Sequence, residues 1–394
     1  MLLQRHSSTR LRELLRRFPI VCVLGPRQCG KTTFIKAALP KWQYLDLEKP
    51  SDLARLSQDP EDALSRLKSR FILDEAQQLP ELFPLLRSFV DEERRKKGRI
   101  VLLGSASPTL VTRISESLAG RAGFLDLTPL QWGELVGKVR AFGLNTLWFR
   151  GGFPDACLQV SNKARVDWFE AYTRTFIERD LSALGIAVSA SQMRRLWTML
   201  AHYHGNVWNA SQLAASLGVS YHTVNRYTDI LEQTFLIRKL PPYHANIRKR
   251  LVKSPKVYLR DTGLLHYFLG VHDQETLNVH PARGKSWEGF VVDQIINAFA
   301  LASPSSQAFY WRTARGEEVD LLILEKGRVI PFEIKLHSAP VSNDVTGLAS
   351  CMRDLGLSRG YVLYPGDRTY SLAGGVEVLS TQALLRNDAL LREL

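Results

Sequence analysis

One eight-residue pattern constrains the fold of this chain more than any other feature. Residues 25–32 read GPRQCGKT, which fits GxxxxGK[ST], and they lie between the apolar run at 20–24 and the helix-compatible stretch at 32–39. A glycine-rich turn between a buried strand and a helix is the context that separates a phosphate-binding loop from a chance match. We therefore expect an α/β fold with a parallel sheet and a nucleotide at the end of its first strand.

Each position of this loop has a physical role. Gly25 and Gly30 let the backbone curl so that successive N–H groups face the phosphates, Lys31 reaches the β and γ oxygens, and Thr32 offers a hydroxyl to Mg²⁺. The following helix adds the positive end of its dipole. ATP and Mg²⁺ are the cofactors that this pattern predicts. The expected nucleotide contacts are Gly25, Pro26, Arg27, Gln28, Cys29, Gly30, Lys31, Thr32 and Thr33.

Further apolar runs alternate with helix-compatible stretches through the first 130 residues. They lie at 43–47, 71–73, 100–103 and 124–127. This alternation is typical of a parallel sheet with helical crossovers. Asp74 and Glu75 follow one run, and Ser105 follows another. Because ligands of open α/β sheets bind beyond the carboxyl ends of the strands, these side chains are expected to converge on the phosphate-binding loop.

The residues at these strand ends suggest a division of labour in phosphoryl transfer. We assign Asp74 to Mg²⁺, which it would hold through water, and Glu75 to the base that orients the attacking water. Ser105 is a candidate sensor of the γ-phosphate, with a plain turn serine as the alternative. Arg113 and Arg121 are candidate arginine fingers, acting in the same or a neighbouring subunit. Arg121 is preferred, and a surface arginine is the alternative.

The length and patterning of the chain predict three regions. A chain of 394 residues with 45% hydrophobic residues can bury more than one core. We expect an ATP-binding domain over 1–130, a helical region over 131–270 and a third α/β domain over 271–394.

The charge of the chain indicates an anionic partner. The formal net charge is +13, and nucleic acid is the commonest polyanion that such a field attracts. No apolar run approaches the ~18 residues that span a bilayer, so we expect a soluble protein without a membrane partner. The four cysteines form no CxxC pair, so neither a disulfide framework nor a zinc site is expected, and a cytoplasmic location fits.

Residues 210–229 fit a helix-turn-helix, within a winged helix that we expect over about 195–260. Gly218 occupies the turn, Ala214 lets the helices approach, and Val224 packs inward. A basic turn downstream would form the wing. The candidate DNA contacts are His222, Thr223, Asn225, Arg226, Arg248, Lys249, Arg250 and Lys253. The alternative is a fold used only for packing or protein contact.

A second carboxylate cluster is expected near the C-terminus. Glu288 lies in a helix-like stretch, Asp320 lies near the start of a strand, and Glu333 and Lys335 end the next strand. Positions two apart on a strand face the same way, so Glu333 and Lys335 share a face. A hairpin turn at 325–328 would bring Asp320 alongside them.

This spacing resembles the PD-(D/E)XK nucleases, whose fold is that of restriction endonucleases. The resemblance implies that Glu288, Asp320 and Glu333 hold Mg²⁺ or Mn²⁺, and that Lys335 orients the nucleophile or balances charge. Two alternatives stay open. The cluster is a chance ion pair at a strand end, or the nuclease fold is retained for binding without cutting.

The motifs taken together resemble the AAA+ superfamily, in particular prokaryotic ATPases with an AAA domain followed by a DUF4143 region. The matching stretches are GPRQCGKT, FILDEAQ at 71–77, LLGSAS at 102–107, SLAGRAG at 117–123, GGFP at 151–154, RD at 179–180 and DTGLLHYFLG at 261–270. The resemblance implies a nucleotide-dependent homo-oligomer, and we favour a hexameric ring.

Two hypotheses about function follow. The first is an ATP-driven machine that remodels or translocates duplex or branched DNA in recombination or repair, associated with the nucleoid. The alternative is a nucleotide-controlled switch or scaffold that binds DNA or protein and carries an inactive nuclease fold.

Overall fold

The structure is a computed structural model, and it describes residues 3–67, 69–105, 114, 116–139, 142–181, 189–243, 253–386 and 391. The chain divides into two compact units, each described here by itself. The first is mainly Met1–Leu130 with Asp229–Leu236, and the second comprises Gln131–Ser182, Ala187–Thr228 and Ile237–Leu394. The predicted boundary at 270 lies inside the second unit, and the division into three domains stays a prediction.

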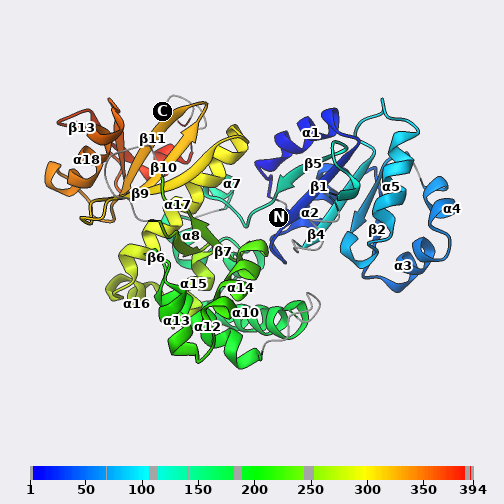
Figure 1. Cartoon of the computed structure of the whole chain (residues 1–394), viewed down its shortest axis with the longest axis horizontal. Coiled ribbons are helices and arrows are strands. Elements are labelled where there is room, and N and C mark those ends of the chain that lie inside the picture. The colour runs from blue at the N-terminus through cyan, green and yellow to red at the C-terminus, as the bar shows by residue number, and fades with distance from the viewer. Residues whose placement is uncertain are drawn as a thin grey trace. The chain divides into compact units, whose positions relative to one another are not determined.

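The first unit is built on a parallel sheet in the order β2-β3-β4-β1-β5 (Figure 1). Its strands are β1 (Ile20–Gly25), β2 (Gln43–Asp46), β3 (Phe71–Asp74), β4 (Ile100–Ser105) and β5 (Ala122–Asp126). All five predicted runs form strands, and β5 begins two residues earlier than expected. The predicted parallel α/β fold is therefore confirmed.

Helices cover both faces of this sheet. On one face lie α1 (Ser7–Arg17) and α2 (Lys31–Ala38), whose apolar side chains pack with Val21 and Val23 of β1. The alternate residues of β1, such as Cys22, pack on the opposite face. That face is covered by α3 (Pro50–Ser57), α4 (Pro60–Ser65) and α5 (Leu82–Asp91).

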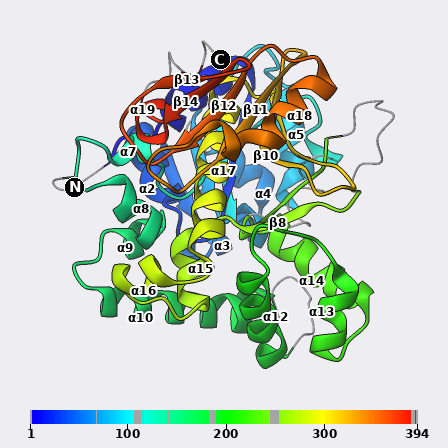
Figure 2. The same ribbon diagram turned by 90° about the vertical axis from the view of Figure 1, so that its left-hand side faces the viewer.

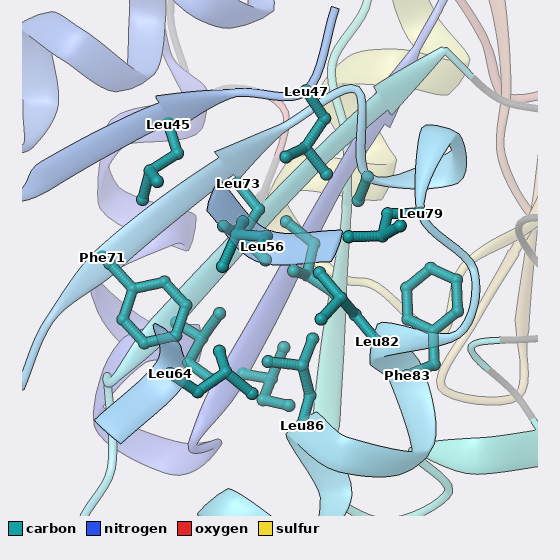
Figure 3. Packing of buried hydrophobic residues seen from close by; sticks show 14 of the residues in the cluster. Leu45, Leu47, Leu56, Leu64, Phe71, Leu73, Leu79, Leu82, Phe83 and Leu86 are labelled. Carbon is teal, nitrogen blue, oxygen red and sulfur yellow. The ribbon is translucent and has the colours of Figure 1, made fainter. Parts of the chain in front are cut away.

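Figure 3 shows part of the second of these cores, in which Leu73 of β3 lies among leucines from the covering helices. Strands covered on both faces read as continuous apolar runs, which is why they were recognisable in the sequence. A short 3-10 helix, η1 (Ala76–Gln78), follows β3.

The N-terminal part of the second unit is helical. Its elements are α7 (Trp132–Leu135), α8 (Leu144–Arg150), α9 (Pro154–Cys157), α10 (Asn162–Thr175), the π-helical turn η2 (Phe176–Asp180), α12 (Ala190–His202), α13 (Ala210–Leu217), α15 (Thr262–Phe268) and α16 (Gln274–Val279). Helix α14 (Tyr221–Gln233) begins in this unit, and its last residues group with the first.

Two of the motifs that resembled the AAA+ family meet at one buried carboxylate. Asp261 caps α15 by accepting a hydrogen bond from the Leu264 N–H at 2.8 Å, and it also accepts one from the Gly152 N–H at 2.6 Å. Gly151 has φ of 76°, and a Cβ there would lie 2.3 Å from Asp261 Oδ1. The GGFP and DTG motifs are therefore explained by packing inside this unit.

A small antiparallel sheet in the order β6-β8-β7 accompanies helices α12, α13 and α14. Its strands are β6 (Asn206–Val207), β7 (Ile237–Leu240) and β8 (Lys256–Leu259). Gly218 ends α13 in the left-handed conformation with φ of 70°, as expected for the turn before α14.

The C-terminal part is a mixed sheet in the order β13-β14-β12-β11-β10-β9. Its strands are β9 (Gln307–Arg312), β10 (Glu318–Glu325), β11 (Arg328–Ile334), β12 (Gly360–Tyr364), β13 (Tyr370–Leu372) and β14 (Val376–Ser380). Lys326 and Gly327, both with positive φ, form the two-residue turn between β10 and β11. This turn type matches the twist of antiparallel strands, and the predicted hairpin is confirmed.

Helices α17 (Arg283–Ala302) and α18 (Thr346–Leu355) pack on this sheet and can be followed in Figure 2. Phe299 of α17 contacts Phe332 of β11, whereas Leu348 of α18 packs in a cluster with Leu322 of β10. The remaining elements are η3 (Ser342–Val345) and α19 (Thr381–Leu384). Among the described residues, no helix has both the length and the apolar character that crossing a membrane requires.

Candidate functional site

The phosphate-binding loop connects β1 to α2. Gly30 precedes α2 with φ of 95°, and Gln28 has φ of 61°, so the loop turns through two left-handed residues. Gly25 ends β1 where a Cβ would lie 2.2 Å from the Leu127 carbonyl oxygen. These positions explain the two glycines of the motif, because glycine alone adopts positive φ without steric cost and tolerates such close backbone approach.

The Lys31 side chain is buried and lies over the loop. Its Nζ donates hydrogen bonds to the carbonyl oxygens of Gly25 at 3.0 Å and Pro26 at 2.9 Å. Phosphate oxygens are stronger acceptors than carbonyl oxygens because they are charged. The Lys31 ammonium can therefore exchange these two carbonyl acceptors for phosphate oxygens. The remaining predicted contacts lie on the same loop and helix. Arg27 pairs with Glu48, Cys29 is buried, and Thr33 is exposed on α2.

Asp74 lies at the end of β3, as predicted, and is buried. Its Oδ2 accepts hydrogen bonds from the Thr32 hydroxyl at 2.6 Å and from the Tyr44 hydroxyl at 2.6 Å. The structure thus brings together the two residues predicted at Mg²⁺, although they come from different elements. The sequence carried no signal for Tyr44. Burial and the Asp74 carboxylate raise the pKa of Tyr44, so its hydroxyl stays a donor.

Glu75 has a left-handed backbone, with φ of 52° and ψ of 47°. This conformation is uncommon for residues other than glycine, and such residues cluster at functional sites. The side chain is half-buried, and its carboxylate accepts a hydrogen bond from the Gln77 amide. Glu75 therefore stands beside Asp74, with its side chain held by a neighbour in the same motif.

The sensor and arginine-finger candidates lie at different ends of the sheet. Ser105 ends β4 and pairs in register with Gly25 of β1, which is the edge where the phosphate-binding loop lies. Arg121 precedes β5, which starts opposite Ile20 at the other edge. The length of β1, six residues at ~3.3 Å each, therefore separates Arg121 from the phosphate-binding loop.

Two bonds hold the Arg121 guanidinium away from the loop, from Nε and Nη2 to the Asp91 carboxylate at 2.8 and 2.7 Å. It is thus remote from the phosphate site of its own chain, and a role in a neighbouring subunit stays a prediction. Arg113 lies outside the described residues.

A second polar cluster lies in the second unit. Glu288 of α17 and Asp320 of β10 meet, as predicted, and Glu318 joins them; one oxygen from each carboxylate lies within 4.8 Å of the others. Glu318 was missed by the sequence reasoning. It is two residues before Asp320, and strand alternation could have placed it on the same face.

The cation among these carboxylates is a lysine that was not predicted. The Lys256 Nζ lies 3.0 Å from Glu288 Oε1 and 3.5 Å from Asp320 Oδ1, and it also contacts Glu318 Oε1. Its side chain is 1% exposed. Tyr258, which shares the strand face of Lys256, donates a hydrogen bond to the same Glu288 oxygen at 2.7 Å.

Glu333 and Lys335 form a separate pair. The Lys335 Nζ donates to Glu333 Oε1 at 2.7 Å, and Glu333 Oε2 is buried without a hydrogen bond to any described residue. The Asp320 carboxylate approaches this strand by accepting a hydrogen bond from the Ile334 N–H at 2.9 Å. The predicted metal set of Glu288, Asp320 and Glu333 therefore differs from the trio that the structure assembles, in which Glu318 takes the place of Glu333.

The pKa values of Glu288, Asp320 and Glu333 differ because burial raises each of them, and nearby ammoniums outweigh that rise only at Glu288. Burial raises the pKa of Glu288, but the Lys256 and Lys285 ammoniums outweigh it and bring the pKa down to about 2. Burial and then the Glu288 charge raise the pKa of Asp320 to about 6. Burial and the Asp320 charge raise the pKa of Glu333 to about 8.

A metal ion does not fit the trio as it stands. An ion bound to all three carboxylates would need the position that the Lys256 ammonium occupies, since that ammonium contacts an oxygen of each of them. Divalent cations bind carboxylate oxygens at about 2.0–2.6 Å, which leaves no room for a second cation.

The predicted DNA-contacting residues of α14 are partly exposed. His222 and Arg226 are exposed one helical turn apart, while Val224 is buried on the other side. Thr223 interacts with the Ser220 hydroxyl at the start of the helix. Asn225 accepts a hydrogen bond from the Trp208 ring at 3.0 Å, which gives it a structural role. Lys253 is exposed, and Arg248, Lys249 and Arg250 lie outside the described residues.

Comparison with known proteins finds three family matches along the chain. An AAA domain matches residues 17–136. A domain of unknown function, DUF8612, matches residues 142–275, and another, DUF4143, matches residues 283–384. The AAA and DUF4143 matches are the two regions that the motifs indicated, and the DUF8612 match lies between them.

Relatives cover nearly the whole chain. An uncharacterized protein of Mycobacterium tuberculosis and one of Mycobacterium bovis are each 42% identical over 385 residues, which is 97% of this chain and 84% of theirs. Among solved structures, a Walker-type ATPase of Pyrococcus abyssi is 16% identical, with a TM-score of 0.47 over 68% of this chain and 96% of its own. A point variant of RuvB from Thermotoga maritima is 19% identical, with a TM-score of 0.28 over 60% of this chain and 86% of its own.

The AAA match covers most of the first unit, in which Lys31 lies on the glycine loop and the Thr32 hydroxyl contacts Asp74 at the end of β3. The chain belongs to the AAA/DUF4143 family of P-loop ATPases.

Proposed function

We propose that this ATPase acts on DNA, using ATP hydrolysis in the first unit to remodel or translocate duplex or branched DNA in recombination or repair. The DNA would be held by the winged-helix region over about 195–260. The working form would be a homo-oligomeric ring, with a hexamer favoured, associated with the nucleoid in the cytoplasm.

One observation carries the DNA part of this proposal, namely the outward face of α14. The face presents Tyr221, His222 and Arg226 to solvent, while Val224 and Tyr227 are buried. The Tyr221 and His222 rings lie 3.9 Å apart between centroids. A helix that buries one side and presents an aromatic pair with a guanidinium on the other can contact phosphates, base edges or unstacked bases.

The net charge of +13 supports the same partner, because basic proteins concentrate polyanions and release counterions when they bind them. It also gives the proposal a measurable property. Binding should weaken steeply as salt rises, and each lost phosphate contact should flatten that dependence.

The hydrolysis step assigns roles to residues of the first unit. Thr32 and Asp74, whose side chains are hydrogen-bonded to each other, would hold Mg²⁺, which when bound neutralises charge on the β- and γ-phosphates. Lys31 would leave its two carbonyl partners for the phosphate oxygens. Glu75, steadied by Gln77, would orient the attacking water and accept its proton. Ser105, at the same sheet edge, would sense the γ-phosphate.

The test is the ATPase rate of the full chain across a panel of linear, single-stranded, flap and four-way DNAs. A motor should be stimulated several-fold by at least one of them. Lys31→Ala should lose turnover, and Glu75→Gln should keep ATP binding while losing hydrolysis. If no DNA form changes the rate of an active preparation, the motor proposal is wrong.

DNA binding is tested separately by fluorescence anisotropy at several salt concentrations. The double variant His222→Ala with Arg226→Ala should weaken binding and reduce the salt slope by about one charge. Arg66→Ala is the matched control, because Arg66 is an exposed arginine of the first unit whose side chain is 73% accessible. Equal effects of the two changes would remove α14 from the interface.

The second candidate is a nucleotide-controlled switch or scaffold with an inactive nuclease fold. The ion pairs of Lys256 favour it, because this ammonium occupies the space beside Glu288 and Asp320, two of the three predicted metal ligands. A switch should bind DNA or a protein with different affinity in its ATP and ADP states while its turnover stays slow and indifferent to DNA. Affinity measured with each nucleotide separates the two candidates.

A further inference from the structure

The carboxylate trio beside the six-stranded C-terminal sheet contains a charged group from a strand of a different sheet. Lys256 belongs to β8, in the three-stranded sheet β6-β8-β7, whereas its partners lie on α17 and on β10. Its Nζ contacts one oxygen of each of Glu288, Glu318 and Asp320. The ammonium thus has the same three acceptors that a divalent ion would use.

The position of this ammonium is fixed by the strand that carries it. β8 is the central strand of its sheet and pairs with β6 and β7 on its two sides, with Leu240 opposite Lys256. All four of its residues are buried. The Tyr258 hydroxyl shares the Glu288 oxygen with the ammonium, so two side chains of one strand face address the same acceptor.

The second oxygen of each carboxylate in the trio also has a hydrogen-bond donor. Lys285 donates to the second Glu288 oxygen at 2.6 Å, and Arg312 donates to the second Glu318 oxygen at 2.9 Å. The second Asp320 oxygen accepts a backbone N–H. Buried carboxylates that already have cations and hydrogen bonds need no metal to offset their desolvation.

We propose that Lys256 is the resident cation of this site. It takes the place of Mg²⁺ or Mn²⁺, ties β8 to α17 and β10, and excludes a divalent metal for as long as it is present. Removing the ammonium should therefore create a metal site from Glu288, Glu318 and Asp320, since carboxylate oxygens are the ligands that Mg²⁺ and Mn²⁺ prefer. This inference does not depend on the action on DNA proposed above.

The experiment measures Mn²⁺ binding to the full chain, without nucleotide or DNA, by electron paramagnetic resonance and isothermal titration calorimetry. Lys256→Ala should bind one more equivalent of Mn²⁺ than wild type, at least tenfold more tightly than any site of wild type. Adding Asp320→Asn to that variant should abolish the extra equivalent. The double variant also subtracts any Mn²⁺ held at Thr32 and Asp74.

Lys285→Ala is the matched control. It removes a lysine from the same carboxylate, but this side chain is 41% accessible and contacts only the outer oxygen. It should gain no Mn²⁺. Equal gains for the two lysine variants would mean that general charge, and not the position of Lys256, excludes the metal, which would overturn the inference.

If Lys256→Ala fails to fold, wild type and Asp320→Asn can still refute the proposal. Wild type that binds an equivalent of Mn²⁺ and loses it on Asp320→Asn would refute the proposal directly. Lys256→Met, which keeps the length of the side chain, offers a second folded variant. Its melting temperature should rise with Mn²⁺ well above the dissociation constant by several degrees more than that of wild type, whose Mn²⁺ can bind only at Thr32 and Asp74.

Discussion

The most informative single change for the stability of this fold is Lys256→Met. Methionine keeps an unbranched side chain of similar length, so packing is largely retained and the ammonium is lost. Glu288, Glu318 and Asp320 would then lie within 4.8 Å of one another without the cation that they share. We expect a large loss of stability at pH 7.

Its size can be worked from Glu288. Burial would raise the pKa of this carboxyl, but the Lys256 and Lys285 ammoniums bring it from 4.5 to about 2 in the folded protein. At 1.36 kcal/mol per pKa unit this corresponds to about 3 kcal/mol. Breaking buried ion pairs elsewhere costs about 3–5 kcal/mol. A carboxyl whose pKa is lower in the folded state stabilises the folded protein at pH values above its pKa in the unfolded chain. For Glu288 this contribution is complete at pH 7 and is lost as the pH falls through about 2.

The assay is equilibrium unfolding in urea at pH 7, without divalent metal. Glu288→Gln, alone and combined with Lys256→Met, completes a double-mutant cycle. The combined variant should be more stable than the sum of the single effects predicts, by about 2–3 kcal/mol, because an amide needs no cation. Lys285→Met is the control, and because the Lys285 side chain is 41% accessible and its charge is screened by solvent, it should cost at most about 1 kcal/mol.

A Lys256→Met loss below about 1 kcal/mol would refute this reasoning, because breaking a buried pair should cost several times as much. A coupling energy near zero would refute it independently. It would mean that Lys256 stabilises through its alkyl chain and not through its charge.

Three further predictions concern other parts of the chain. Burial raises the pKa of Asp261 from 3.8 to about 6, so the folded state retains a proton that the unfolded state loses. Stability measured by thermal unfolding should therefore fall more between about pH 4 and 6 in wild type than in Asp261→Asn, and equal profiles would contradict this burial. Arg121→Ala should match Asp91→Ala in stability and leave ATP turnover near wild type, because the pair lies at the sheet edge opposite the phosphate-binding loop. A hundredfold slower turnover in Arg121→Ala alone would instead place this arginine in a neighbouring subunit's site. Gly25→Ala should abolish ATP binding, measured with a fluorescent analogue, because its Cβ would meet the Leu127 carbonyl at 2.2 Å; unchanged affinity would show that the loop can shift.

The ATP site was predictable because its chemistry is written in short, local patterns. Gly30 and Lys31 are neighbours in sequence, and the backbone geometry that they require is local. Asp74 could be added because parallel strands end at one edge, which follows from the order of apolar runs. Tyr44 could not, since nothing in a short strand marks which side chain reaches an acid on the next strand.

The C-terminal carboxylate cluster was predicted only in part, for a different reason. The hairpin turn and strand alternation placed Asp320 and Glu333, and the same alternation could have placed Glu318. Lys256 is far from all of them in sequence, and its run of basic residues was interpreted as a wing that contacts DNA.

The sequence by itself determined the order of the strands along the chain, the phosphate-binding loop and the family, because these depend on local periodicity and on motifs. Only the tertiary structure decided which cation neutralises the C-terminal carboxylates and which edge of the sheet holds Arg121. Both depend on long-range packing, where a buried charge takes whichever opposite charge the fold brings within a few ångströms, whatever their separation in the chain.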